Sequence, residues 1–186
     1  TELYFNYGHG FHSNDARGTT IRVDPADPGT RIRRADPLVR TRGSEIGVRS
    51  EPIPGWQSTL SLWRLEAASE LLFVGDAGTT EASRPSHRHG LEWTNLYRPT
   101  GWLALDADLS RSHARFRDSS PEGRHIPGAV TTTANLGVTV AAVGPWFGAA
   151  RLRYFGPRPL TEDGALRSRA SALTNLRVGH RLDPRT

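Results

Sequence analysis

Apolar and polar residues alternate along long segments of the chain, and this pattern limits the possible folds more than any other feature. The stretch HGLEWTNLYRPTGWLALDADLS (89–110) holds two such segments joined by a short turn. In the second segment, Leu103 and Leu105 fall on one parity, whereas Asp106 and Asp108 fall on the other. Successive side chains of a β-strand point to opposite faces. Each segment therefore predicts a strand with one apolar and one charged face.

The same period of two recurs along the whole sequence, and no window shows a helical period over three turns. Strands are predicted at 2–12, 39–51, 56–73, 87–98, 102–116, 129–141, 146–156 and 169–182. They are longer than the five or six residues that are usual in soluble sheets. The sequence therefore predicts an all-β fold, an antiparallel meander of about eight long strands.

The apolar pattern changes phase inside one predicted strand. In 56–73, Leu60 and Leu62 share one parity, whereas Trp63 and Leu65 share the other. A β-bulge adds one residue and would return the later pair to the face of the earlier one. A bulge is therefore expected in this strand.

The predicted connections alternate between short and long. Turns rich in Pro and Gly occupy 51–55, 98–101 and 142–145, and polar loops occupy 13–38, 74–86, 117–128 and 157–168. Outer-membrane barrels have this arrangement, with short periplasmic turns and long extracellular loops. The 13–38 loop is expected to be poorly ordered without its neighbours.

Aromatic residues lie beside the short turns. Trp56, Trp102 and Trp146 directly follow the three turns, and Tyr97 precedes one of them. Aromatic residues repeated at one height are typical of the girdle at a membrane interface. Trp102 does not share the parity of Leu103, so the girdle pattern is imperfect. The alternative to a girdle is that three unrelated core tryptophans lie beside turns.

The two predicted faces differ in chemistry. The polar faces carry charges of both signs, which could pair across neighbouring strands. The candidates for lumen-facing residues are Glu45, Arg49, Glu92, Asp106, Asp108, Arg151, Arg153, Arg177 and Arg181. The candidates for lipid contact and for the girdle are Trp56, Trp93, Tyr97, Leu103, Leu105, Leu136, Val138, Trp146, Leu152 and Tyr154.

The arginines of the polar faces suggest a binding role. A guanidinium group binds carboxylates and phosphates bidentately. Arg151, Arg153, Arg177 and Arg181 could therefore draw an anionic ligand through a lumen. The alternative is that they pair with carboxylates of the wall.

Composition limits the chemistry of the chain. It has no cysteine, which excludes disulfides, zinc–thiolate sites and thiol nucleophiles. It has no run of about 18 apolar residues, so no transmembrane helix is encoded, but a membrane strand needs only alternate apolar residues. The net charge is +5, yet the arginines are spread over the whole chain, so nucleic-acid binding is not predicted.

Histidines and paired acids are weaker candidates. His87 and His89 form an HxH pair that could chelate copper, zinc or nickel, but no third ligand lies at a fixed short spacing. No metal site or cofactor is assigned. Asp106 and Asp108 share a face without a partner acid or a nucleophile, so they are interpreted as wall residues that face water. No nucleophile elbow is present, and no enzymatic activity is predicted.

A series of motifs runs along nearly the whole chain in a fixed order. The motifs are ELYFNYGHGFHSNDARG (2–18), DPLVRTRGSEIGVRSE (36–51), STLSLWRLEAASELLFVGDAGTT (58–80), the segment 88–116, IPGAVTTTANLGV (126–138) and RLRYFGPRPL (151–160). The series resembles the barrel of TonB-dependent receptors, the outer-membrane transporters of Gram-negative bacteria. Each motif alone has low specificity, whereas their order is fairly specific.

The resemblance implies a fold, a location and partners. Members of the family have a 22-stranded barrel, plugged by an N-terminal domain, and import siderophores, cobalamin and other scarce ligands with energy from TonB. Residues 1–186 are therefore expected to be a partial barrel domain from the C-terminal part, a curved open sheet without the plug, the TonB box or the final strands. The implied partners are outer-membrane lipid, the remaining strands and plug, TonB through the missing N-terminal part, and an imported ligand such as an iron chelate.

Two other folds stay open from the residues alone. A soluble or secreted β-sandwich, used for adhesion or carbohydrate binding, would bury both apolar rows. A small complete outer-membrane barrel would pair the first predicted strand with the last. A receptor fragment would leave strands 2–12 and 169–182 unpaired with each other and would expose an apolar convex face.

Overall fold

The structure is a computed structural model. It describes residues 1–13, 19–20, 22–23, 27–31, 36–74, 79–82 and 84–182, with the backbone alone for 71–74 and 79–82. Part of the 13–38 loop, and the prediction about its order, therefore lies outside the described residues. No helix among the described residues is long and apolar enough to cross a membrane.

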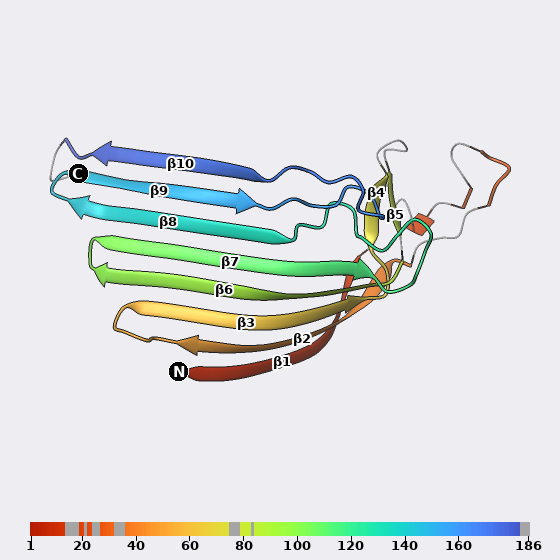
Figure 1. Cartoon of the computed structure of the whole chain (residues 1–186), viewed down its shortest axis with the longest axis horizontal. Helices are drawn as coiled ribbons and strands as arrows, with labels where there is room; N and C mark the ends of the chain where they lie inside the picture. Colours follow the sequence, from red (N-terminus) through yellow and green to blue (C-terminus); the bar gives the residue numbers. More distant parts are fainter. Residues whose placement is uncertain are drawn as a thin grey trace.

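Eight strands form one antiparallel sheet in which neighbours in the sheet follow one another along the chain (Figure 1). They are β1 (Glu2–Ser13), β2 (Leu38–Ser50), β3 (Trp56–Ala67), β6 (Ser86–Thr100), β7 (Leu103–Phe116), β8 (Thr132–Val143), β9 (Trp146–Phe155) and β10 (Ser171–His180). A separate hairpin consists of β4 (Leu71–Val74) and β5 (Thr79–Ala82). The predicted all-β meander of eight long strands is confirmed.

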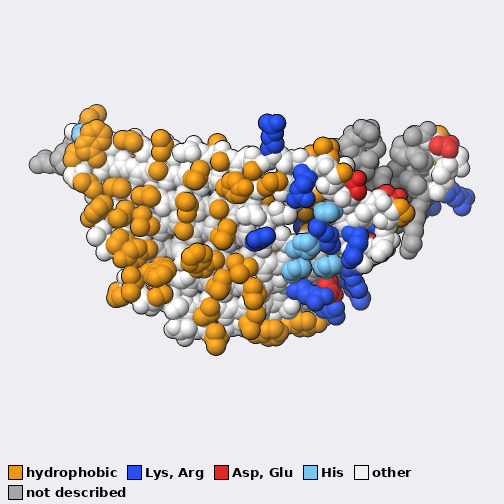
Figure 2. Space-filling view, in the orientation of Figure 1, with side chains coloured by type: hydrophobic (Ala, Val, Ile, Leu, Met, Phe, Trp, Pro, Cys, Tyr) orange, Lys and Arg blue, Asp and Glu red, His pale blue; other side chains and the backbone are white. Residues whose placement is uncertain are grey.

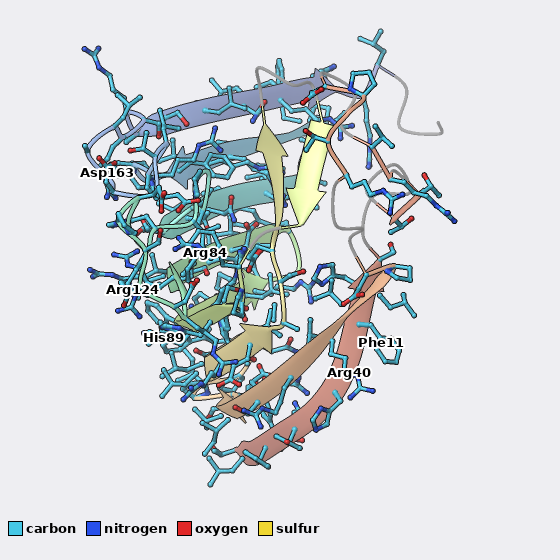
Figure 3. All side chains as sticks on the ribbon, turned by 90° about the vertical axis from the view of Figure 1, so that its right-hand side faces the viewer. Phe11, Arg40, Arg84, His89, Arg124 and Asp163 are labelled. Atoms are coloured by element: carbon cyan, nitrogen blue, oxygen red, sulfur yellow. The ribbon has the colours of Figure 1, made fainter. Side chains whose placement is uncertain are left out.

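The sheet is open. Strands β1 and β10 are its two edges, and among the described residues they pair only with β2 and β9. Figure 3 views the molecule from its loop end and shows that the sheet curves, with the β4–β5 hairpin on the concave side. A small closed barrel would pair β1 with β10, so that alternative is wrong.

The predicted strand 56–73 is wrong beyond Ala67. Ala67 lies opposite Ser86, the first residue of β6, so the ladder of the main sheet ends there. The next apolar residues, 71–74, have no partner in the main sheet and pair instead with 79–82. The predicted loop 74–86 therefore contains a short strand of its own.

The expected bulge in this strand is also wrong. Strand β3 pairs with β2 and with β6 in continuous register, so Trp63 and Leu65 project from the face opposite to Leu62. The Trp63 ring lies over Gly90 of β6, where the missing side chain leaves room for it. The register shifts of β6–β7 and β8–β9 occur beside short turns, at Tyr97/Thr100 and Val140/Val143.

Replacing Gly90 by Ala is expected to destabilise the sheet by about 1–3 kcal/mol, because an overpacked side chain forces its neighbours to move. A Cβ atom on Gly90 would lie 2.6 Å from the Arg111 carbonyl oxygen and 2.8 Å from Trp63 Cζ2. The matched control is Gly8→Ala, since a Cβ there meets no atom within 4 Å. Urea unfolding of both variants measures the difference, and an equal loss of stability would contradict the prediction.

The buried core is small. Ala114, Phe116 and Ile126 form one cluster at the loop end, with Ala129 packed against it. Large apolar side chains elsewhere stay exposed, as Leu176 (77 %) and Val178 (78 %) illustrate. The second sheet among the described residues is the two-stranded β4–β5 hairpin, and it leaves the apolar side chains of the main sheet exposed, so the sandwich alternative is wrong.

Candidate functional site

The pairing register sorts the side chains onto two faces of the sheet. Leu105 lies opposite Tyr97 on one side and Val138 on the other, so apolar residues of neighbouring strands share a face. In Figure 2 this face is turned to the viewer, and hydrophobic side chains are spread over the part away from the loop end. The hydrophobic field extends across the strands from β1 to β10, and we call it the apolar belt.

All ten candidates for lipid contact lie on or beside this face. They are Trp56, Trp93, Tyr97, Leu103, Leu105, Leu136, Val138, Trp146, Leu152 and Tyr154. Leu136 is 53 % exposed although it occupies a central strand. That this exposed face contacts lipid remains a prediction.

Aromatic residues gather at the turn end of the apolar belt. Trp56 lies opposite Tyr97, and its Nε1 atom donates a hydrogen bond of 3.2 Å to Asn95 Oδ1. Trp146 packs edge-to-face on His180, with 4.6 Å between the ring centroids. Amphipathic rings of this kind suit a boundary between water and an apolar phase.

Eight of the nine lumen-facing candidates lie on the opposite, polar face. The register places Glu45, Arg49, Glu92, Asp106, Asp108, Arg151, Arg153 and Arg177 there. Arg181 follows the end of β10, and its backbone N–H donates to the Pro145 carbonyl oxygen. That the polar face lines a lumen remains a prediction.

Four of these residues come together in one depression of the polar face. Asp106, Asp108, Arg151 and Arg153 line it with Asn135, and its volume is ≈ 410 Å³. Arg151 Nη2 lies 3.5 Å from Asp106 Oδ1. The intervening residue of β8 is glycine, Gly137, and any Cβ there would overlap the Asp106 carboxylate. The missing side chain thus lets the two charges meet across a strand.

The other lumen-facing candidates lie apart from this depression. Tyr4 Oη and Asn6 Nδ2 donate to the Glu45 carboxylate, at 3.3 and 3.2 Å. Arg49 lies 3.8 Å from the Glu2 carboxylate, and both side chains are exposed. Arg177 Cζ lies 5.4 Å from the centre of the Phe147 ring. Glu92 lies opposite Ser110 and Ser61.

Arg84 joins three connections at the loop end, and the sequence gives no indication of this role. Its Nη2 atom donates to Glu162 Oε2 at 2.6 Å and to the Gly123 carbonyl oxygen at 2.8 Å. Its guanidinium carbon lies 4.1 Å from the centre of the Phe116 ring. These partners are 39 and 78 residues away in the sequence, so no local pattern could identify them.

The loop that supplies Glu162 has its own local order. Thr161 Oγ1 donates to Asp163 Oδ1 at 2.5 Å, and the Ala165 N–H donates to the same oxygen at 3.0 Å. These bonds favour the charged carboxylate, so they hold the pKa of Asp163 below its usual range. Gly164, with φ of 73°, closes the turn.

The histidines of the HxH pair lie on the face of the apolar belt, at its loop end. His87 and His89 are stacked with 6.2 Å between ring centroids, and His113 lies 5.3 Å from His89. The described part of the chain contains no group of three His, Cys, Asp or Glu side chains that could hold a metal ion.

A family model described as "TonB dependent receptor-like, beta-barrel" matches residues 1–186. No curated protein matches the sequence. The fold is similar to that of the copper transporter OprC, with a TM-score of 0.68, 19 % identity and coverage of 98 % of this chain and 29 % of that one. It is also similar to the ferric yersiniabactin uptake receptor FyuA from Yersinia pestis, with a TM-score of 0.71, 16 % identity and coverage of 96 % and 27 %. At such identities the similarity concerns the fold alone, and this chain spans less than a third of either structure.

Proposed function

Because the chain belongs to the TonB-dependent receptor-like β-barrel family, we propose that it forms part of the wall of an outer-membrane transporter barrel. Residues 1–186 are one partial barrel domain in this proposal. The polar concave face lines the lumen, and the loop end lies at the cell exterior. The role of the chain is to bind and guide a ligand, without catalysis.

The observation that carries the proposal is the exposed apolar belt on a sheet whose edge strands, β1 and β10, each pair with one neighbour among the described residues. Leu136, Leu176 and Val178 are each more than half exposed. A folded protein in water rarely leaves a continuous apolar surface of this extent uncovered. Lipid chains cover such a surface in an outer-membrane barrel, where the apolar band is about 25 Å tall.

The partners follow from the two edges and the two faces. The outer edges of β1 and β10 pair with no other strand in the described part of the chain, so they are available to further barrel strands. An uncovered edge would otherwise favour aggregation. The convex face meets outer-membrane lipid, and the concave face meets the plug and the imported ligand. TonB acts through a part of the receptor outside this chain.

The proposed ligand is an anionic chelate such as a siderophore complex. Arg153 and Arg177 have exposed side chains and no carboxylate within ion-pair distance among the described residues. Arg151 is 53 % exposed and holds Asp106 at 3.5 Å, so it can exchange that partner for a ligand carboxylate. FyuA is named as a ferric yersiniabactin uptake receptor, which agrees with a metal chelate as cargo.

The double substitution Arg151→Gln and Arg153→Gln is expected to reduce uptake of an anionic iron chelate about tenfold. Each guanidinium lost removes a charge-assisted hydrogen bond worth about 1.5–3 kcal/mol at full strength, and less in an open lumen. Uptake of the iron-loaded chelate by cells that depend on the receptor measures the effect.

The control for this test is Arg98→Gln together with Arg158→Gln, which removes the same charge from two exposed positions outside the depression. Its uptake should stay within about twofold of the unsubstituted receptor. Equal uptake by the two double variants would contradict the proposed role of Arg151 and Arg153 in ligand binding. Absence of the receptor from the outer-membrane fraction would overturn the proposed function itself.

A further inference from the structure

The face of the apolar belt is the convex face of the sheet, since the labelled His89 lies on the outer side in Figure 3, and its chemistry changes at the loop end. Figure 2 shows histidine and arginine side chains gathered there, beyond the hydrophobic field. The register assigns five arginines to this face, Arg40, Arg42, Arg64, Arg111 and Arg115. On the same face of the described strands Glu66 is the one carboxylate. The loop end of the face therefore carries an excess of positive charge.

The single carboxylate leaves part of this charge without a partner. Glu66 accepts hydrogen bonds from Arg42 at 2.5 Å and from Arg64 at 2.8 Å. Among the described residues, neither Arg111 nor Arg115 has a carboxylate within ion-pair distance. Arg115 Nη1 donates a hydrogen bond to the Ala114 carbonyl oxygen, at 3.0 Å. Both guanidinium groups can therefore accept an external anion.

Histidines lie between the arginines of neighbouring strands. In one row across the sheet Arg64 lies opposite His89, and His89 lies opposite His113. In the next row His87 lies opposite Arg115. A neutral imidazole still offers one N–H donor, and a protonated one offers two. We call the set of Arg64, His87, His89, Arg111, His113 and Arg115 the histidine–arginine belt.

The histidine–arginine belt lies at a defined height above the turn-end aromatic residues. Strand β7 advances ten residues from Leu103 to His113, which is about 33 Å along the strand at about 3.3 Å per residue. With a strand tilt of about 40°, the difference in height is about 25 Å, the height of the apolar band of an outer-membrane barrel. The belt therefore falls at the level where the acyl chains of the outer leaflet end and the headgroups begin.

From this position and charge, we propose that the histidine–arginine belt binds the phosphate group of an anionic lipid in the outer leaflet. The inference rests on the proposed function, because it needs the apolar belt to lie in the membrane. The guanidinium groups of Arg111 and Arg115 bind phosphate oxygens, and the imidazoles of His89 and His113 donate further hydrogen bonds. The acyl chains of the same lipid lie along the apolar belt below.

The test measures lipid retained by the purified receptor that contains this chain. The receptor is equilibrated in mixed micelles with phosphatidic acid, or with phosphatidylcholine of the same acyl chains, and bound lipid is counted by native mass spectrometry. Arg111→Gln with Arg115→Gln is expected to weaken retention of phosphatidic acid about thirtyfold, since each basic residue near a lipid surface contributes about fivefold. Phosphatidylcholine retention should not change.

Two further variants complete the test. Arg111→Lys with Arg115→Lys keeps both charges and should restore most of the retention, and Arg151→Gln with Arg153→Gln removes the same charge from the concave face without effect on lipid. Equal retention by the Gln variant of the belt and the unsubstituted receptor would overturn the inference. Displacement of the lipid by an equal concentration of inorganic phosphate would assign the site to free phosphate and also overturn it. Failure of the proposed function is distinct, because the unsubstituted receptor would then be missing from the outer-membrane fraction.

Discussion

Replacing Leu136 by Arg is expected to destabilise the barrel by about 2–4 kcal/mol, because a guanidinium group would enter the middle of the apolar band. Leu136 lies opposite Ala107 and Leu152, at the centre of the convex face, and its side chain is 53 % exposed. The measurement is the free energy of unfolding in urea, with the receptor folded into lipid vesicles. This substitution tests directly whether the exposed apolar belt faces lipid.

The matched control is the neighbouring substitution Asn135→Arg. Asn135 lies on the opposite face, between Asp108 and Arg153. A new guanidinium at this water-exposed position would be attracted by Asp108 and repelled by Arg153. The free energy of unfolding is therefore expected to change by no more than about 1 kcal/mol. If both variants lost the same stability, or if Leu136→Arg lost none, the convex face would not be the lipid-facing one.

Replacing Arg84 by Ala is expected to destabilise the folded structure of the loop end by about 3 kcal/mol. The change removes the bonds to Glu162 and the Gly123 carbonyl oxygen, and it uncovers the fully buried Phe116 ring. It also leaves the half-buried carboxylate of Glu162 without its cationic partner, and an unpaired buried charge is strongly destabilising. Limited proteolysis between 117 and 131 and between 157 and 170 measures the effect, with cleavage expected to be at least about tenfold faster.

Arg117→Ala is the control for this prediction. Arg117 lies in the same connection, its side chain is exposed, and its described hydrogen bond comes from the backbone N–H to the Pro85 carbonyl oxygen. A substitution of that side chain leaves the backbone bond in place. Equal cleavage rates in the two variants would show that Arg84 does not hold the three connections together.

The errors in the predicted strands have one physical origin. Apolar residues are a local signal, and they recur at 71–74 after the main sheet has ended at Ala67. Whether an apolar segment joins the sheet depends on where the neighbouring strand starts, here at Ser86. The prediction of a bulge in β3 is wrong for a related reason. Trp63 fits on the polar face because Gly90 lies beside it on another strand, and no pattern within β3 contains that information.

The sequence by itself determined the number of main strands, their order and the two faces. These follow from the alternation of side chains along a strand and from the Pro- and Gly-rich turns, which are properties of short segments. Only the tertiary structure decided which side chains of different strands meet. It placed Asp106 beside Arg151 across Gly137, His89 beside His113, and Arg84 against Glu162. Such contacts depend on register between strands and on the path of long loops, and neither is encoded in the period of one segment.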